Sequence, residues 1–126
     1  MRNLSGMAEQ AFKTSLLSTV IRYVQLNFEP CCIVVSRGGK VTYSIRSEDM
    51  RDQGLGWVAE GSRLPKTSVT AKIIDAASSN QPVEHGAAVA CDVWFQRSRR
   101  ETLWEECRIL GGTGLVLTFI VLQLEE

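Results

Sequence analysis

Apolar residues recur about every four positions near the N-terminus of the chain. This is the spacing of one face of an α-helix, and polar residues such as Lys13 and Arg22 fall outside it. We therefore predict an amphipathic helix over residues 8–28, closed by Pro30, which cannot continue a helix. The predicted apolar stripe comprises Phe12, Leu16, Leu17, Val20, Tyr23, Val24 and Phe28.

A period of two replaces this spacing after Pro30. The runs CCIVVS and VTYSIR are rich in β-forming residues and flank the turn sequence Arg37-Gly38-Gly39-Lys40. Because glycine adopts positive φ angles without strain, this arrangement predicts a β-hairpin. In the second strand one predicted face is apolar (Val41, Tyr43, Ile45) and the other is polar (Thr42, Ser44, Arg46).

Residues 47–66 have no clear period and include several glycines, Pro65 and a lone Trp57. We interpret them as a long, partly structured crossing segment. Thr67 or Ser68 is then placed to cap a short helix that ends near residues 78–80. The apolar face of that helix comprises Val69, Ile73, Ile74 and Ala77.

Three further strands are predicted, over residues 87–96, 102–110 and 115–122. Alternation in the first two puts Trp94 and Trp104 on one polar side of the sheet, together with Asp92 and Arg108. We expect Asp92 to lie opposite Arg108, because the register two residues away sets Asp92 against Glu106, a repulsion of up to about 1 kcal/mol. The last run is apolar on both faces, which predicts a strand in the interior of the sheet.

This order of elements predicts a single α+β domain over residues 1–126. We expect an antiparallel sheet of about five strands. The long N-terminal helix should cover one face, and the crossing segment and short helix should cover the other. The arrangement resembles the GAF and PAS sensor domains, in which a ligand or partner is held under the crossing segment.

Composition narrows the functional classes. Fourteen basic residues balance fourteen acidic ones, so no net field attracts the domain to nucleic acid or anionic lipid. The four cysteines lack CxxC spacing and are expected to be reduced and buried. His85 is the only histidine, so neither a metal site nor a catalytic thiol is predicted, and we expect no cofactor. The start of the chain lacks the apolar core of a signal peptide and no run is long enough for a membrane span, so a cytoplasmic protein is expected.

Most of the chain after Phe12 resembles the C-terminal GAF-like region of ImmA/IrrE-type metallopeptidases. The similar segments are GLGWVAEGSRLPKTSVTAKIIDA, AAVACDVWFQRSRRETLWEEC and LVLTFIVLQLEE. The resemblance implies a non-enzymatic sensor domain that controls a peptidase domain, which in turn cleaves a transcriptional repressor. The chain has no HExxH motif, so it corresponds to the sensor alone, either excised or as a fragment of a larger metallopeptidase. The matching residues are Gly61, Leu64, Pro65, Ser68, Trp94, Phe95, Leu103, Glu105, Glu106, Leu117 and Thr118.

Two binding hypotheses follow. The first is a site on the polar sheet face for a small molecule, a nucleotide, single-stranded DNA or the peptidase domain, roofed by Trp57. Its predicted ligand-binding residues are Arg46, Trp57, Asp92, Trp94, Trp104 and Arg108, with Thr42 and Ser44 on the same face. The alternative is a nucleic-acid-binding module in which Arg97, Arg99 and Arg100 contact phosphates and the tryptophans stack on bases. A third possibility is a homodimer formed through the long helix or a sheet edge.

Overall fold

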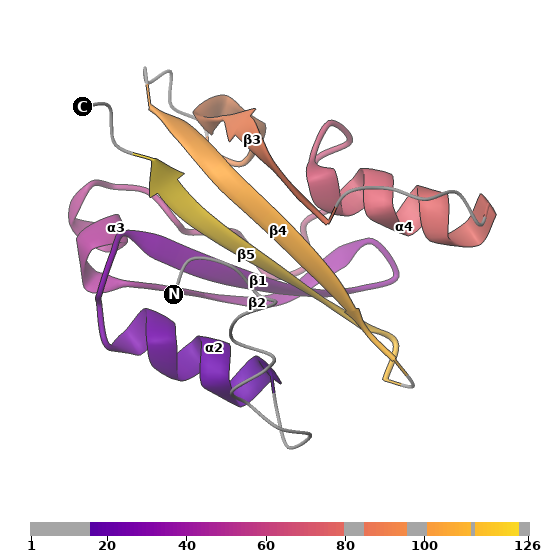
Figure 1. Ribbon diagram of the computed structural model, residues 1–126, viewed down its shortest axis with the longest axis horizontal. Helices are drawn as coiled ribbons and strands as arrows, with labels where there is room; N and C mark the ends of the chain where they lie inside the picture. Colours follow the sequence, from indigo (N-terminus) through magenta and orange to yellow (C-terminus); the bar gives the residue numbers. More distant parts are fainter. Residues whose placement is uncertain (1–15, 80–84, 96–100, 112, 124–126) are drawn as a thin grey trace.

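The computed structural model describes residues 16–79, 85–95, 101–111 and 113–123. Over these residues the chain forms three α-helices, one 3-10 helix and five strands (Figure 1). The helices are α2 (Leu16–Gln25), α3 (Glu48–Asp52), α4 (Val69–Ser79) and the 3-10 helix η1 (Cys91–Val93). The strands are β1 (Cys31–Arg37), β2 (Lys40–Arg46), β3 (Gly86–Ala90), β4 (Thr102–Leu110) and β5 (Leu115–Gln123).

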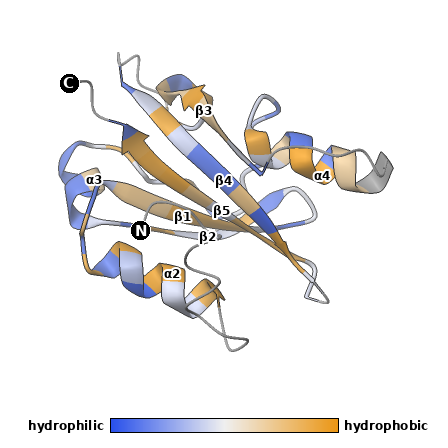
Figure 2. Cartoon of the chain, in the orientation of Figure 1, coloured by the Kyte–Doolittle hydropathy of each residue, from blue (hydrophilic) through white to orange (hydrophobic). Residues whose placement is uncertain are grey.

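The strands make one antiparallel sheet in the order β2-β1-β5-β4-β3. This confirms the predicted α+β fold, a small open-sheet domain of the GAF/PAS-like type. As predicted, β5 lies in the interior of the sheet, and Figure 2 shows β5 and β1 as mostly hydrophobic strands while β4 alternates along its length. Strands covered on both faces are apolar at nearly every position, which explains the pattern in β5, where Thr118 is the one buried polar residue.

Helix α2 packs against β1 and β2 on one side of the sheet, which we call the α2 face. Val20 and Val24 are fully buried there against Ile33 and Phe119. The predicted helix extended to Phe28, but α2 ends at Gln25. Asn27 has a φ of 56° and Phe28 is 68% exposed, so the apolar stripe continues past the end of the helix without being buried. The predicted first turns, residues 8–15, lie outside the described residues.

The predicted hairpin between β1 and β2 is confirmed. Gly38 and Gly39 form its turn with φ angles of 59° and 79°. The predicted alternation in β2 is only partly correct, because a bulge shifts the register after Val35. Val41 therefore packs in the core on the opposite side of the sheet, whereas Tyr43 and Ile45 pack on the α2 face.

The other side, which we call the α4 face, is covered by α3, the crossing segment, η1 and α4. Ser68 caps α4 as predicted, because its hydroxyl accepts a hydrogen bond from the Ala71 amide at 3.1 Å. Ile73 of α4 packs against Cys107 of β4. No helix in the described part of the chain has both the length and the hydropathy of a bilayer-spanning segment.

The predicted strand over residues 87–96 is wrong in its second half. β3 ends at Ala90, which pairs with Thr102, and the chain then turns into η1. Asp92 lies exposed in η1, and Arg108 is paired with Leu117 of β5, so the predicted Asp92–Arg108 register is also wrong. An exposed charge pair contributes about 0–1 kcal/mol to the free energy of unfolding. Burying an aromatic side chain contributes about 2–3 kcal/mol. Burial of Trp94 and Phe95 therefore outweighs an Asp92–Arg108 pair.

A candidate ligand-binding cleft

The two tryptophans that were predicted to share a polar face lie on opposite faces of the sheet. Trp94 follows η1 and is buried on the α4 face with Phe95 and Leu103. Trp104 packs on the α2 face beside the core around Phe119. The 3-10 turn breaks the strand alternation, so that both Trp94 and Phe95 point into the core. The predicted binding face on the polar side of β3 and β4 is therefore wrong.

Trp94 takes part in a buried polar network around Glu105. The indole Nε1–H of Trp94 donates to Glu105 Oε1 at 2.8 Å. The backbone N–H and the hydroxyl of Thr70 both donate to Glu105 Oε2 at 2.7 Å. The Thr70 hydroxyl also contacts the Thr118 hydroxyl at 2.6 Å. Glu105 belongs to β4 and is fully buried against the first turn of α4. Its hydrogen bonds therefore connect β4 to α4 and to the residue after η1.

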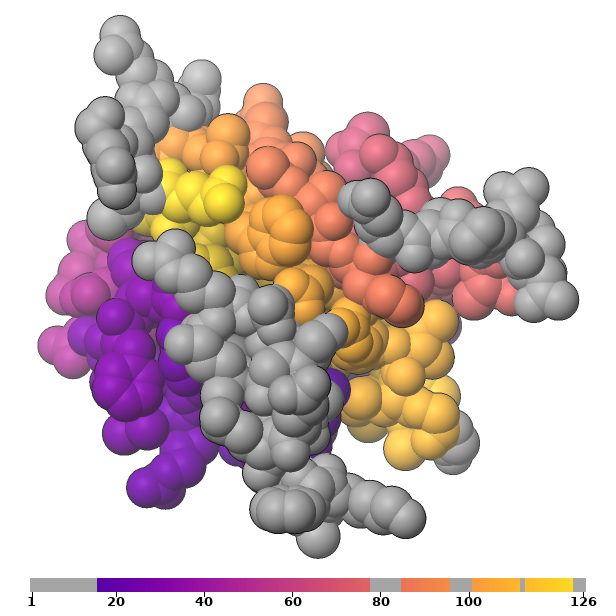
Figure 3. Space-filling model, viewed as in Figure 1, coloured from indigo at the N-terminus to yellow at the C-terminus, as the bar shows by residue number. Residues whose placement is uncertain are grey.

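A second indole–carboxylate pair lies on the α2 face. Trp104 Nε1–H donates to Glu106 Oε1 at 3.0 Å, and Arg108 lies 3.6 Å from the other carboxylate oxygen. Arg108 therefore pairs with Glu106, although Asp92 was the residue predicted to lie opposite it. A Cβ at Gly86 would come within 2.8 Å of the Trp104 ring, so only glycine leaves room for the ring across β3. Figure 3 shows atoms of β3 and β4 at the surface in the same view as α2.

A cleft of about 480 Å³ opens on the α4 face, between the crossing segment and the chain after η1. Its volume is within the range of small-molecule sites, roughly 300–1,000 Å³. Trp94 and Phe95, which are 8% and 6% exposed, line it from the chain after η1, and Trp57, which is 69% exposed, lines it from the crossing segment. The lining residues are 54–59, Ser62, Arg63, Pro65, Trp94 and Phe95.

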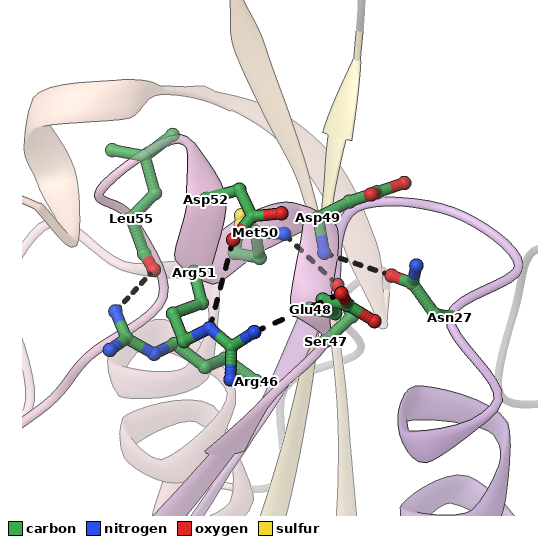
Figure 4. A network of polar contacts seen from close by, with 9 residues as sticks. All are labelled: Asn27, Arg46, Ser47, Glu48, Asp49, Met50, Arg51, Asp52 and Leu55. Atoms are coloured by element: carbon green, nitrogen blue, oxygen red, sulfur yellow. Dashed lines mark hydrogen bonds and ion pairs between the residues drawn. The ribbon is translucent and has the colours of Figure 1, made fainter.

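The crossing segment is held against the edge strand β2 on both sides of Trp57. Before it, the Arg46 guanidinium donates to the Leu55 carbonyl at 3.0 Å (Figure 4). After it, the Ser44 hydroxyl donates to the Val58 carbonyl at 3.0 Å. Gly56 has a φ of 86°, and a Cβ there would come within 2.5 Å of the Met50 side chain. Trp57 is thus presented from a fixed backbone, because its neighbours on each side are tied down.

The beginning of the crossing segment is fixed by α3. The Ser47 hydroxyl accepts a hydrogen bond from the Met50 amide, and the Asn27 side chain accepts one from the Asp49 amide (Figure 4). The same hydroxyl also accepts a hydrogen bond from the Cys31 amide. Met50 is fully buried below. Arg51 makes only exposed ion pairs with neighbours in α3, which add little stability. The capping bonds and Met50 therefore fix this end.

Arg63 supplies the charge at the cleft. Its backbone forms a bridge with Lys40 at the edge of β2, and the adjacent Leu64 amide donates to the Gly39 carbonyl at 3.0 Å. The Arg63 side chain is exposed and has no carboxylate partner among the residues that the structure describes. Within the same described part of the chain, the Trp57 indole N–H has no acceptor. The cleft thus offers a cation and an N–H donor beside aromatic walls.

The cysteines are free and buried, as predicted. Burial raises the pKa of the Cys31 and Cys107 thiols from 9.0 to about 12, and it raises that of Cys32 further. These thiols are poor nucleophiles because almost none is ionised at neutral pH.

Over residues 16–79, 85–95, 101–111 and 113–123 no cluster of three potential metal ligands occurs, and His85 is exposed.

The structure brings together only part of the predicted site. Trp57 and Trp94 line the cleft, and Arg46 holds its crossing segment. Asp92 is exposed on η1, and Trp104 and Arg108 lie on the α2 face, so these three do not contribute. The basic residues of the alternative hypothesis, Arg97, Arg99 and Arg100, lie outside the described residues.

Sequence reasoning missed the roles of Arg63, Phe95, Thr70 and Glu105. For Glu105 a signal was present, since it lies between Leu103 and Cys107 on the apolar side of β4. A carboxylate at such a position requires buried donors. Arg63 had no comparable signal, because the crossing segment has no period from which its neighbours could be inferred.

No protein-family model matches this chain, and no curated protein is significantly similar to it. The relation to the GAF-like region of ImmA/IrrE-type peptidases therefore stays a prediction that rests on the short segments quoted above.

Proposed function

We propose that this chain is a non-enzymatic sensor domain that binds a small-molecule signal in the cleft beneath its crossing segment. The observation that carries the proposal is the aromatic cleft itself, which the exposed Trp57 lines together with the buried Trp94 and Phe95. A large exposed indole on a fixed backbone is costly to leave in water, and a ligand that covers it recovers part of that free energy.

Trp94 connects the cleft to helix α4. It forms a wall of the cleft and donates to Glu105, whose other oxygen accepts from the first turn of α4. A ligand that shifts the indole changes this shared hydrogen bonding, so α4 is the element expected to respond. In keeping with the ImmA/IrrE resemblance, we propose that the responding partner is a peptidase domain that cleaves a repressor, in the cytoplasm, where free thiols stay reduced.

A thermal-shift screen of metabolites against the purified domain tests this function. A ligand that binds only the native form raises the melting temperature, by an amount that grows with its concentration above the Kd. The expected result is at least one compound whose shift is lost in Trp57→Ala. That exposed substitution should itself leave stability within about 0.5 kcal/mol of wild type. A screen without any stabilising compound, or shifts unaffected by Trp57→Ala, would contradict the proposed function.

A further inference from the structure

We infer that the ligand of the cleft is a planar aromatic anion, bound by stacking of its ring on Trp57 and by pairing of its negative group with Arg63. This inference rests on the proposed function and specifies its ligand class. The phosphate of a nucleotide and the carboxylate of an aromatic acid share the required chemistry.

The ring requirement comes from the shape and composition of the walls. Trp57 is 69% exposed while Trp94 and Phe95 are nearly buried, so a flat ring in the cleft that these three residues line gains contact with an indole that otherwise faces water. Stacking on an exposed aromatic side chain strengthens binding roughly ten-fold or more. An aliphatic ligand of equal volume lacks the matching flat surface for the indole.

The anion requirement comes from charge. Arg63 lines the cleft and, in the part of the chain that the structure describes, has no acidic partner to neutralise it. Its backbone is fixed by the bridge to Lys40, so the side chain starts from a defined position at the cleft that Trp57 also lines. A guanidinium binds carboxylates and phosphates with two parallel hydrogen bonds, which orients a ligand as well as holding it.

The test follows the indole N–H signals of the 15N-labelled domain by NMR during titrations. Trp57 and Trp94 report on the cleft, and Trp104, on the opposite face, is an internal control. The probes are adenosine 5′-monophosphate, adenosine, ribose 5-phosphate and indole-3-acetate. We expect adenosine 5′-monophosphate or indole-3-acetate to shift Trp57 and Trp94 but not Trp104, and whichever binds more tightly identifies phosphate or carboxylate as the preferred group. Adenosine should bind about ten-fold more weakly than its monophosphate, and ribose 5-phosphate should cause no shift.

Two variants, one of an arginine and one of a lysine, distinguish a specific contact from a general effect of positive charge. Arg63→Ala should abolish the preference for the monophosphate over adenosine, whereas Lys66→Ala, which removes an exposed cation outside the cleft lining, should retain it. Equal affinity for adenosine and its monophosphate, with shifts at Trp57 and Trp94, would overturn the inferred ligand class and leave the proposed function standing. An absence of shifts with all four probes would also overturn it, while the wider thermal screen decides the function separately. A single-stranded oligonucleotide that binds more tightly than the mononucleotide would replace the small anion by nucleic acid.

Discussion

Removing the buried carboxylate of Glu105 should destabilise the domain more than any other single substitution of an acidic residue in the described structure. Its two oxygens accept three hydrogen bonds, from the Trp94 indole and from the amide and hydroxyl of Thr70. In Glu105→Ala the hydroxyl keeps its contact with Thr118, but the indole and the amide lose their acceptors. A buried donor without an acceptor costs about 1–3 kcal/mol. The two donors together therefore predict a loss of about 2–6 kcal/mol by the same principle.

This loss is large compared with the total stability of a small domain, about 5–15 kcal/mol. Guanidinium unfolding followed by far-ultraviolet circular dichroism measures it directly. The matched control is Glu106→Ala, which removes the neighbouring carboxylate on the opposite face. Its partners Trp104 and Arg108 are only half-buried and can turn to water, so a loss of about 1 kcal/mol is expected.

A double-mutant cycle assigns the effect to the indole. Trp94→Phe removes the donor, and Glu105→Gln keeps the size of the acceptor side chain. Residues joined in one buried network should show a coupling free energy of about 0.5–3 kcal/mol. The reasoning would be refuted if Glu105→Ala lost less than Glu106→Ala, or if the effects of Trp94→Phe and Glu105→Gln were simply additive.

Two further predictions concern the α2 face and the thiols. Gly86→Ala should lower the free energy of unfolding by about 1–3 kcal/mol, because its Cβ would meet the Trp104 ring at 2.8 Å. Gly111→Ala, which has open space around it, should be nearly neutral in the same unfolding assay. Equal effects of the two substitutions would contradict the close packing at Gly86. Because burial raises the pKa of Cys31 and Cys107 from 9.0 to about 12, the native thiols bind protons more tightly than the unfolded ones. This contribution to stability should therefore be present below pH 9 and be lost between about pH 9 and 12. At pH 8 the native protein should react with a thiol reagent far more slowly than the unfolded protein. Equal reaction rates would contradict the burial of the thiols.

Elements with strong local signals could be predicted from the sequence. The α2 stripe around Val20 and Val24, the Gly38-Gly39 hairpin and the Ser68 cap depend on residues close together in the chain. The interior position of β5 follows from a run that is apolar on both faces, so it too can be inferred without long-range contacts.

The candidate site could not be predicted in the same way. Alternation was extended from β3 through Trp94, but the chain leaves the strand at Ala90 and turns. What favours the turn is distant in sequence: Leu55 and Leu64 of the crossing segment cover Trp94, and Glu105 accepts its indole N–H. Strand alternation alone cannot reveal such partners. It therefore placed Trp94 on the wrong face of the sheet.

The three indoles differ in what covers them and in what accepts their N–H. Trp94 is covered by the protein and hydrogen-bonded within it, and Trp104 lies across Gly86 and donates to Glu106. Trp57 has neither cover nor acceptor among the described residues, although its backbone is held in place. The two structural indoles use carboxylates that the chain itself supplies. By the same chemistry we propose that Trp57, with Arg63 lining the same cleft, is matched to the ring and the negative charge of a ligand.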